Sequence, residues 1–116
     1  DFAPTFADLA GIEFSADGRS LAPLLRGEDP AWRSAVLLEG FSGGNPPSYE
    51  AVRTETHKYV EYDNGETELY DLEADPYELE NLPKISNLSL AANLKTKLYA
   101  LRSCAGDECR KAEDTQ

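Results

Sequence analysis

The sequence contains no methionine, so Asp1 cannot be the residue at which translation starts. We therefore expect the chain to be a processed product or a piece cut from a longer protein. It also lacks an apolar run approaching the roughly 20 residues that a membrane span needs, and it has no visible signal peptide. A length of 116 residues predicts one small domain.

Basic residues are scarce. The chain has 11 Lys and Arg against 22 Asp and Glu, which gives a formal net charge of −11. Phosphate binding needs clustered Lys and Arg, so a nucleic-acid partner is not expected. A free-standing binder of sulfated polyanions is disfavoured for the same reason. The acid excess is better explained as a source of solubility.

Cysteine and histidine are also rare, with Cys104, Cys109 and a single His57. Two thiols do not make a structural zinc site, and the histidine is too distant in sequence to decide the matter. The spacing of the cysteines around Gly106 favours a short disulfide loop, with free thiols as the alternative. A disulfide would indicate export, because cytosolic thiols stay reduced. Asn87 begins an N-glycosylation sequon, Asn-Leu-Ser, which is compatible with export.

The first third of the chain is predicted to be helical. Asp1 can cap a helix that carries Phe2 and Phe6 and ends at Gly11. A second short helix is expected over 21–26. Neither Phe2 nor Phe6 has an obvious covering partner in the sequence, so we expect exposed apolar surface here.

Strands are expected in the middle of the chain. Residues 35–41 have the length and composition of a strand, and 42–48 form an irregular loop. Asn64-Gly65 between two apolar runs predicts a hairpin with a two-residue type I′ turn. In that register the Tyr59 face of the sheet is left without cover. The expected pairs are Tyr62 with Thr67, Glu61 with Glu68, Val60 with Leu69, Tyr59 with Tyr70, and Lys58 with Asp71.

The C-terminal part predicts one long helix over 87–103, because Leu90, Leu94, Leu98 and Leu101 recur at helical spacing. Packed on the strands, it gives an α+β fold: an antiparallel sheet of about four strands against a C-terminal helix. The polar segment 111–116 is expected to be a disordered tail.

Several segments together resemble the C-terminal region of formylglycine-dependent sulfatases. The pattern G-E-x-E-L-Y-D-L-x-x-D-P-x-E-x-x-N-L occupies 65–82. D-x-x-P-T-x-x-D-L-A-G-I occupies 1–12, and D-G-x-S-L-x-P-L-L-x-G occupies 17–27. V-R-T at 52–54 is followed by K-Y. The ending C-x-G-x-x-C-R, at 104–110, is similar to the N-acetylglucosamine-6-sulfatase and arylsulfatase branch.

The resemblance implies an organisation in which the chain is only the end of an enzyme. Residues 1–33 would be two short helices that end a large α/β domain, and 34–110 would be the C-terminal α+β subdomain, packed on its own N-terminal domain. The parent would hydrolyse a sulfated sugar or an aryl sulfate. It would be secreted or extracytoplasmic, and lysosomal if eukaryotic.

The resemblance also implies that the family's reaction chemistry lies outside this chain. Sulfatases make formylglycine within a C/S-x-P-S-R motif and hold a calcium ion with Asp and Asn residues, and neither motif is present here. No catalytic residue, cofactor or metal site is therefore expected. The acidic run 71–75 opens like a calcium-binding loop but lacks the required glycine and final glutamate. Alone, the chain is expected to be inactive.

Three cationic residues are candidates for substrate contact, namely Arg53, His57 and Lys58, and the 42–48 loop is a candidate for the rim of the cleft. Each has a structural alternative: His57 as a packing or surface residue, Lys58 paired with Asp71, and Arg53 paired with another carboxylate. An alternative function is a non-catalytic module that binds a protein or a glycan through the second face of its sheet.

Overall fold

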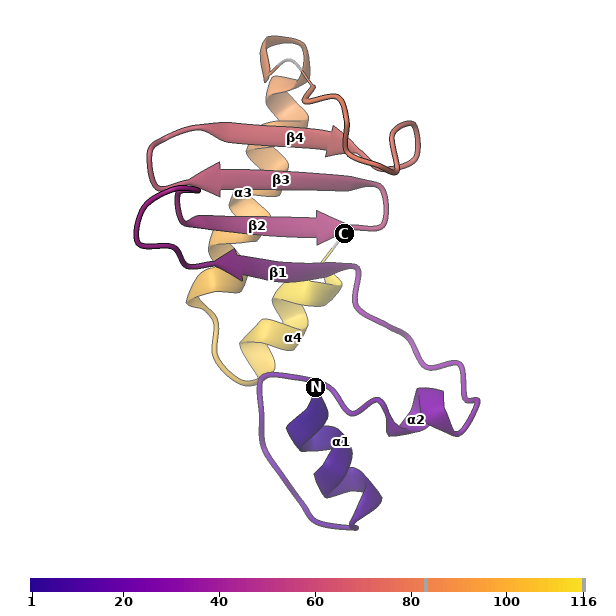
Figure 1. Ribbon diagram of the computed structural model, residues 1–116. Helices are drawn as coiled ribbons and strands as arrows, with labels where there is room; N and C mark the ends of the chain where they lie inside the picture. The colour runs from indigo at the N-terminus through magenta and orange to yellow at the C-terminus, as the bar shows by residue number, and fades with distance from the viewer. Residues whose placement is uncertain (83, 116) are drawn as a thin grey trace.

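The computed structural model describes residues 1–82 and 84–115. Within them the chain forms a four-stranded antiparallel sheet in the order β1-β2-β3-β4, and the helix α3 (Leu88–Ser103) crosses one face of it (Figure 1). The α+β prediction is therefore confirmed. The strands are β1 (Ala35–Gly40), β2 (Tyr49–Thr54), β3 (His57–Tyr62) and β4 (Thr67–Asp71).

The remaining helices lie outside this layer. α1 (Phe2–Leu9) and α2 (Ala22–Leu25) lie away from the sheet, at the foot of Figure 1. Gly11 and Gly27 adopt positive φ just after them, as expected of glycines that end helices. A 3-10 turn, η1 (Lys84–Asn87), leads into α3, and α4 (Asp107–Asp114) contacts α3 and β1.

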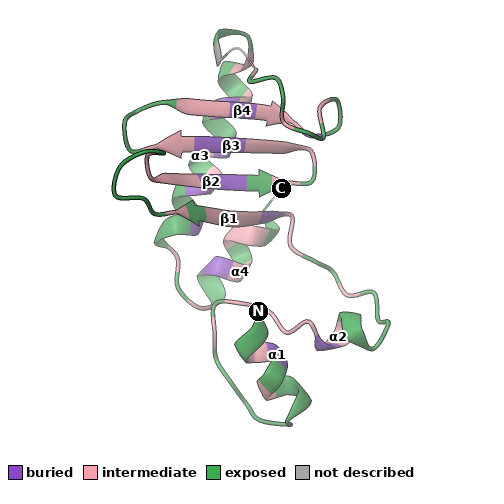
Figure 2. Ribbon diagram, viewed as in Figure 1, coloured by how far each residue is buried: buried purple, intermediate pink, exposed green. Residues whose placement is uncertain are grey.

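The core lies between α3 and the sheet face that it covers, which we name the helix face. Leu94, Leu98 and Leu101 recur at intervals of three and four residues, so they lie on one side of α3. They are buried against Val52 and Tyr59 from the sheet. Figure 2 shows this buried band along the middle of the strands and on α3. Burying each leucine stabilises the fold by roughly 2 kcal/mol.

The register of β3 with β4 differs by one residue from the prediction. The N–H of Tyr62 donates to the Glu66 carbonyl at 3.0 Å, so the hairpin loop has three residues. Gly65 has φ +88, but Asn64 does not share the positive φ that a type I′ turn requires at both positions. The expected register, including the Lys58–Asp71 pair, is therefore wrong. The observed pairs are Glu61 with Thr67, Val60 with Glu68, Tyr59 with Leu69, Lys58 with Tyr70, and His57 with Asp71.

This shift of one residue changes which side chains share a face. Tyr59 lies on the helix face and is 1% exposed, so the prediction that its face lacks cover is wrong. The opposite side of the sheet, which we name the open face, carries no helix among the described residues. Its side chains are Val36, Leu38, Tyr49, Ala51, Arg53, Lys58, Val60, Tyr62, Glu68 and Tyr70.

The segment expected to be a disordered tail is instead ordered. Residues 107–114 form α4, and Glu113 near its end forms ion pairs with Arg19 and Arg33. The prediction for 111–116 is therefore wrong over the part that the structure describes, and Gln116 lies outside the described residues. The helix was missed because its partners are distant in the sequence. The expected exposure of Phe2 (72%) and Phe6 (66%) is confirmed.

Candidate functional site

The loop after β4 is stabilised by hydrogen bonds that its own carboxylates accept from backbone N–H groups. Asp71 Oδ1 accepts hydrogen bonds from the N–H groups of Glu73 and Ala74, each at 3.0 Å, and these bonds lower the pKa of Asp71. Asp75 Oδ2 accepts the N–H of Glu80 at 2.8 Å. Such short-range bonds from Asp to the backbone are typical of turns. Two of the acidic residues in the sulfatase-like pattern thus have structural roles.

The end of that pattern closes the edge of the sheet. Asn81 Oδ1 accepts the N–H of Leu69 at 3.0 Å, and the N–H of Leu82 donates to the Leu69 carbonyl at 2.8 Å. These bonds satisfy backbone groups that an edge strand would leave unpaired. Residues 81–82 therefore complete β4.

Glu78 joins the loop to the open face. Its Oε1 is 3.0 Å from Arg53 Nη1 and its Oε2 is 2.5 Å from Lys58 Nζ. We name Arg53, Lys58 and Glu78 the open-face triad. Glu78 has φ +56, which side-chain-bearing residues rarely adopt, and its N–H donates to the Asp75 carbonyl at 3.1 Å. The loop therefore holds this carboxylate in place with a strained backbone.

The triad carries two cations and one anion, so it presents a net positive charge on a protein whose overall charge is −11. The Arg53 side chain is 46% exposed, and only one of its nitrogens forms the ion pair with Glu78. Lys58 is more enclosed and lies 5.8 Å from the centre of the Tyr70 ring. Chemically, this arrangement can contact an anionic group through Arg53 while Glu78 fixes both cations.

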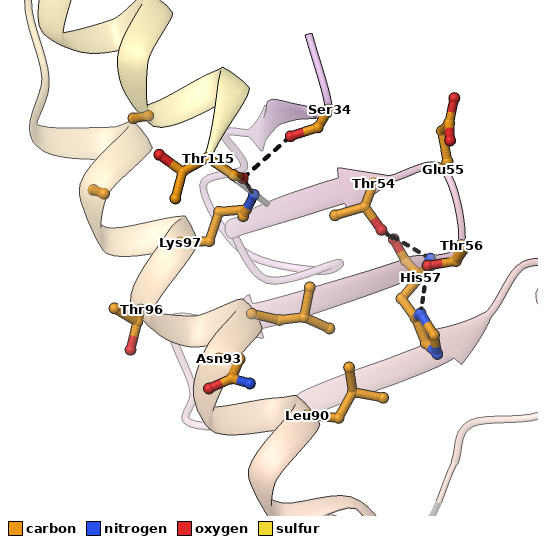
Figure 3. A pocket seen from close by; sticks show the side chains of 13 residues that line it. Ser34, Thr54, Glu55, Thr56, His57, Leu90, Asn93, Thr96, Lys97 and Thr115 are labelled. Atoms are coloured by element: carbon orange, nitrogen blue, oxygen red, sulfur yellow. Dashed lines mark hydrogen bonds between the residues drawn. The ribbon is translucent and has the colours of Figure 1, made fainter.

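His57 lies on the other face of the sheet, beside a groove of about 700 Å³ (Figure 3). The ring Nδ1 of His57 is 2.8 Å from Thr56 Oγ1, and its backbone N–H donates to Thr54 Oγ1 at 3.0 Å. Across the groove Lys97 donates to the Thr115 carbonyl, and burial lowers the Lys97 pKa. The structure therefore brings Arg53 and Lys58 together and separates His57 from them.

The 42–48 loop lies at the far end of the strands from the triad. The N–H of Asp63 donates to the Ser48 carbonyl at 3.0 Å, which places this loop beside the β3–β4 turn. Ser48 Oγ closes the loop by donating to the Ser42 carbonyl at 2.9 Å. The structure thus does not place the expected rim loop with Arg53 and Lys58.

Sequence reasoning missed Glu78 because the wrong register gave Lys58 a different partner. The available signal was the glutamate in D-P-x-E, which the sulfatase-like pattern already contained. V-R-T and K-Y lie on neighbouring strands and supply Arg53 and Lys58, and D-P-x-E, about 20 residues later, supplies Glu78. Three parts of the resemblance therefore converge in one cluster.

The remaining predicted residues lie near the C-terminal end. Cys104 and Cys109 form the expected disulfide, with an S–S distance of 2.01 Å. Asn87 ends η1 and is partly exposed, and its glycosylation stays a prediction. Across residues 1–82 and 84–115 there is no cluster of three or more side chains suited to a metal ion. None of the helices described there is long and apolar enough to cross a membrane.

Comparison with known proteins identifies relatives of this chain. Residues 1–104 match the family described as N-sulphoglucosamine sulphohydrolase, C-terminal. The chain is 32% identical to N-acetylglucosamine-6-sulfatase of Homo sapiens, over 95% of this chain and 27% of the relative. It is 39% identical to N-acetylglucosamine-6-O-sulfatase of Bacteroides thetaiotaomicron, over 71% of this chain and 16% of the relative.

Solved structures share the fold. One is a protein in complex with its substrate D-glucosamine-2-N,6-O-disulfate, with a TM-score of 0.78 and 29% identity over 98% of this chain and 24% of that one. Another is the phosphonate monoester hydrolase of Agrobacterium radiobacter, with a TM-score of 0.72 and 28% identity over 86% of this chain and 23% of that one. The chain spans about a quarter or less of the length of these relatives. The match over residues 1–104, with the shared fold, shows that the chain belongs to the N-sulphoglucosamine sulphohydrolase C-terminal family, the C-terminal region of sulfatases.

Proposed function

We propose that the parent of this chain is a sulfatase that releases sulfate from a 6-O-sulfated glucosamine residue. The supporting observation is the match to N-acetylglucosamine-6-sulfatases from two distant organisms. The solved relative whose substrate is D-glucosamine-2-N,6-O-disulfate supports the same substrate class. In the overall reaction one water is consumed, the ester is cleaved, and the sugar hydroxyl and inorganic sulfate leave.

In this proposal the chain completes the fold of the parent. Residues 1–33 end the large α/β domain, and 34–110 form the subdomain that packs on it. The exposed stripe of α1 supports this division. The Phe2 and Phe6 rings are exposed and stack with their centroids 6.3 Å apart, whereas Thr5 of the same helix is buried. A helix that exposes its apolar side and buries a threonine is expected to have a further covering partner.

Calcium and formylglycine, which the sulfatase resemblance implies, fit no residues of this chain. The sequence has no C/S-x-P-S-R motif, and the described residues hold no metal-ligating cluster. We assign both groups to the upstream domain and derive no reaction step from residues 1–116.

Arg53 and Lys58 are the residues through which this chain would contact the substrate. Their position with Glu78 gives a fixed cationic pair on the open face, and sulfated sugars carry the complementary charge. Substrate contact by His57 would need a separate approach, since it lies on the helix face. Export of the parent to the lysosome or the cell exterior is supported by the Cys104–Cys109 disulfide.

The test is substrate preference of the parent protein. Hydrolysis of N-acetylglucosamine-6-sulfate, of an aryl sulfate and of a phosphonate monoester is measured by ion chromatography of the sulfate or phosphonate released. We expect the highest kcat/KM on the sulfated sugar. A preference for the phosphonate would overturn the proposal, and a preference for the aryl sulfate would overturn the assigned substrate class.

A further inference from the structure

The helix α4 has few buried side chains to hold it in place. It has eight residues, and Cys109 is the one residue of the helix that is buried. Isolated helices shorter than about 12 residues are marginal in water even for favourable sequences. Its order therefore depends on what holds its two ends.

The first turn of α4 is held by a covalent bond and by residues near the N-terminus of the chain. The disulfide ties Cys109 to Cys104, just after α3. The N–H of Gly106 donates to Asp17 Oδ1 at 2.6 Å, and Arg110 Nη1 donates to the Ala16 carbonyl at 2.5 Å. The start of α4 thus joins α3 to a segment about 90 residues earlier in the chain.

The last turn of α4 is held by ion pairs to the same part of the chain. Glu113 Oε2 is 3.2 Å from Arg19 Nε, and its Oε1 is 3.2 Å from Arg33 Nη1. The three side chains are only 12 to 15% exposed, so solvent screens them weakly. The Glu113 carbonyl also accepts the N–H and Oγ–H of Ser34, at 3.0 and 2.7 Å. Glu113 therefore contacts Arg19, Arg33 and Ser34 at the boundary between 1–33 and the sheet.

We propose that α4 is a clamp that fastens the end of the large domain to the C-terminal subdomain, with Glu113 and the Cys104–Cys109 disulfide as its two anchors. The proposal rests on the proposed function in one respect, that 1–33 belong to the large domain. Loss of either anchor frees α4 and then residues 16–34. The sheet and α3 have their own core and stay folded.

The test is amide hydrogen exchange by mass spectrometry on the full 116-residue chain. Glu113→Gln should raise exchange in 16–34 and 107–114 by about tenfold, while β2–β4 keep wild-type protection. Glu108→Gln is the matched control, because it removes the same charge from an exposed position on the same helix. The Cys104→Ser/Cys109→Ser variant tests the second anchor and should give the same pattern.

Unchanged exchange in 16–34 in either variant would overturn the clamp as a device with two anchors. Equal loss of protection in β2–β4 would overturn it too, because α4 would then be part of one cooperative unit. Sulfate release is not measured in this experiment, so its outcome is independent of whether the parent is a sulfatase.

Discussion

Lys58 and Glu78 lie 20 residues apart in the sequence, yet Lys58 Nζ is 2.5 Å from Glu78 Oε2. Lys58 lies beside Arg53 on the open face, where both contact the loop that carries Glu78, and the three-residue hairpin loop pairs Lys58 with Tyr70 and not with Asp71. Had the hairpin followed the type I′ register, Lys58 would face Asp71. This pair therefore reports the register of the sheet and the conformation of the 72–80 loop together.

Replacing Glu78 tests that relationship. Glu78→Gln leaves two cations close together without their shared carboxylate, and we expect a loss of about 1 kcal/mol, since both partners are partly exposed. Urea unfolding followed by circular dichroism measures it. Glu80→Gln, at an exposed position two residues later, should change the free energy of unfolding by less than about 0.5 kcal/mol. Equal effects of the two variants would show that the triad adds no stability.

Leu98 tests the core. It is fully buried between α3 and the sheet, so Leu98→Ala should cost about 3 kcal/mol through lost burial and the cavity left behind. Leu88→Ala removes the same atoms from an exposed position at the start of α3 and should cost less than about 1 kcal/mol. Thermal and urea unfolding of both variants provide the comparison. A cost for Leu98→Ala as small as that of the control would contradict the helix-on-sheet core.

The environment of Glu61 predicts how the free energy of unfolding changes at low pH. Partial burial acts to raise its pKa, but hydrogen bonds from Lys95, Tyr59 and Tyr99 outweigh burial and hold the pKa below the ordinary value of 4.5. A carboxylate with a lowered pKa in the folded state stabilises the protein above its unfolded-state pKa. That contribution is lost as the pH falls through the folded-state pKa.

Unfolding free energies at a series of pH values between 6 and about 3 test this. The wild type should lose stability on acidification, and Glu61→Gln should lose less over the same range. Glu39→Gln, at an exposed position on β1, serves as the charge-matched control and should follow the wild type. A Glu61→Gln profile parallel to the wild type would refute the assigned pKa shift.

Arg53 tests substrate contact in the parent protein. Arg53→Gln should raise KM for the sulfated sugar about tenfold and leave kcat within about twofold, as expected for loss of a binding interaction. Arg102→Gln removes a similarly exposed arginine from α3, which covers the helix face, and should leave both constants near wild type. An unchanged KM in Arg53→Gln would reduce the open-face triad to a structural role.

The elements of this fold with local signals were predictable from the sequence. The leucine spacing predicts α3, and the alternation of residues predicts the strands, because each pattern is visible within a short stretch of sequence. The hairpin register was not predictable in this way, because Asp63-Asn64-Gly65 supports both a two-residue and a three-residue loop. The choice between them depends on which face of β3 is buried by α3, which is a long-range effect.

The same distinction holds for the candidate site. Arg53 and Lys58 were identifiable as cations near a strand end, but their partner Glu78 comes from a loop with a strained backbone. α4 has a polar sequence with one buried residue, and its order depends on Arg19 and Arg33, about 80 to 95 residues earlier. Contacts of that separation leave no periodic pattern in the sequence.

The most direct test of the account compares this chain with its parent in one assay. Sulfate release from N-acetylglucosamine-6-sulfate is measured for the isolated 116-residue chain and for the parent protein at equal concentration. We predict release by the parent and none above the buffer blank by the isolated chain, because the proposed function assigns the catalytic groups to residues outside this chain. Turnover by the isolated chain, or no turnover by the folded parent, would contradict this prediction.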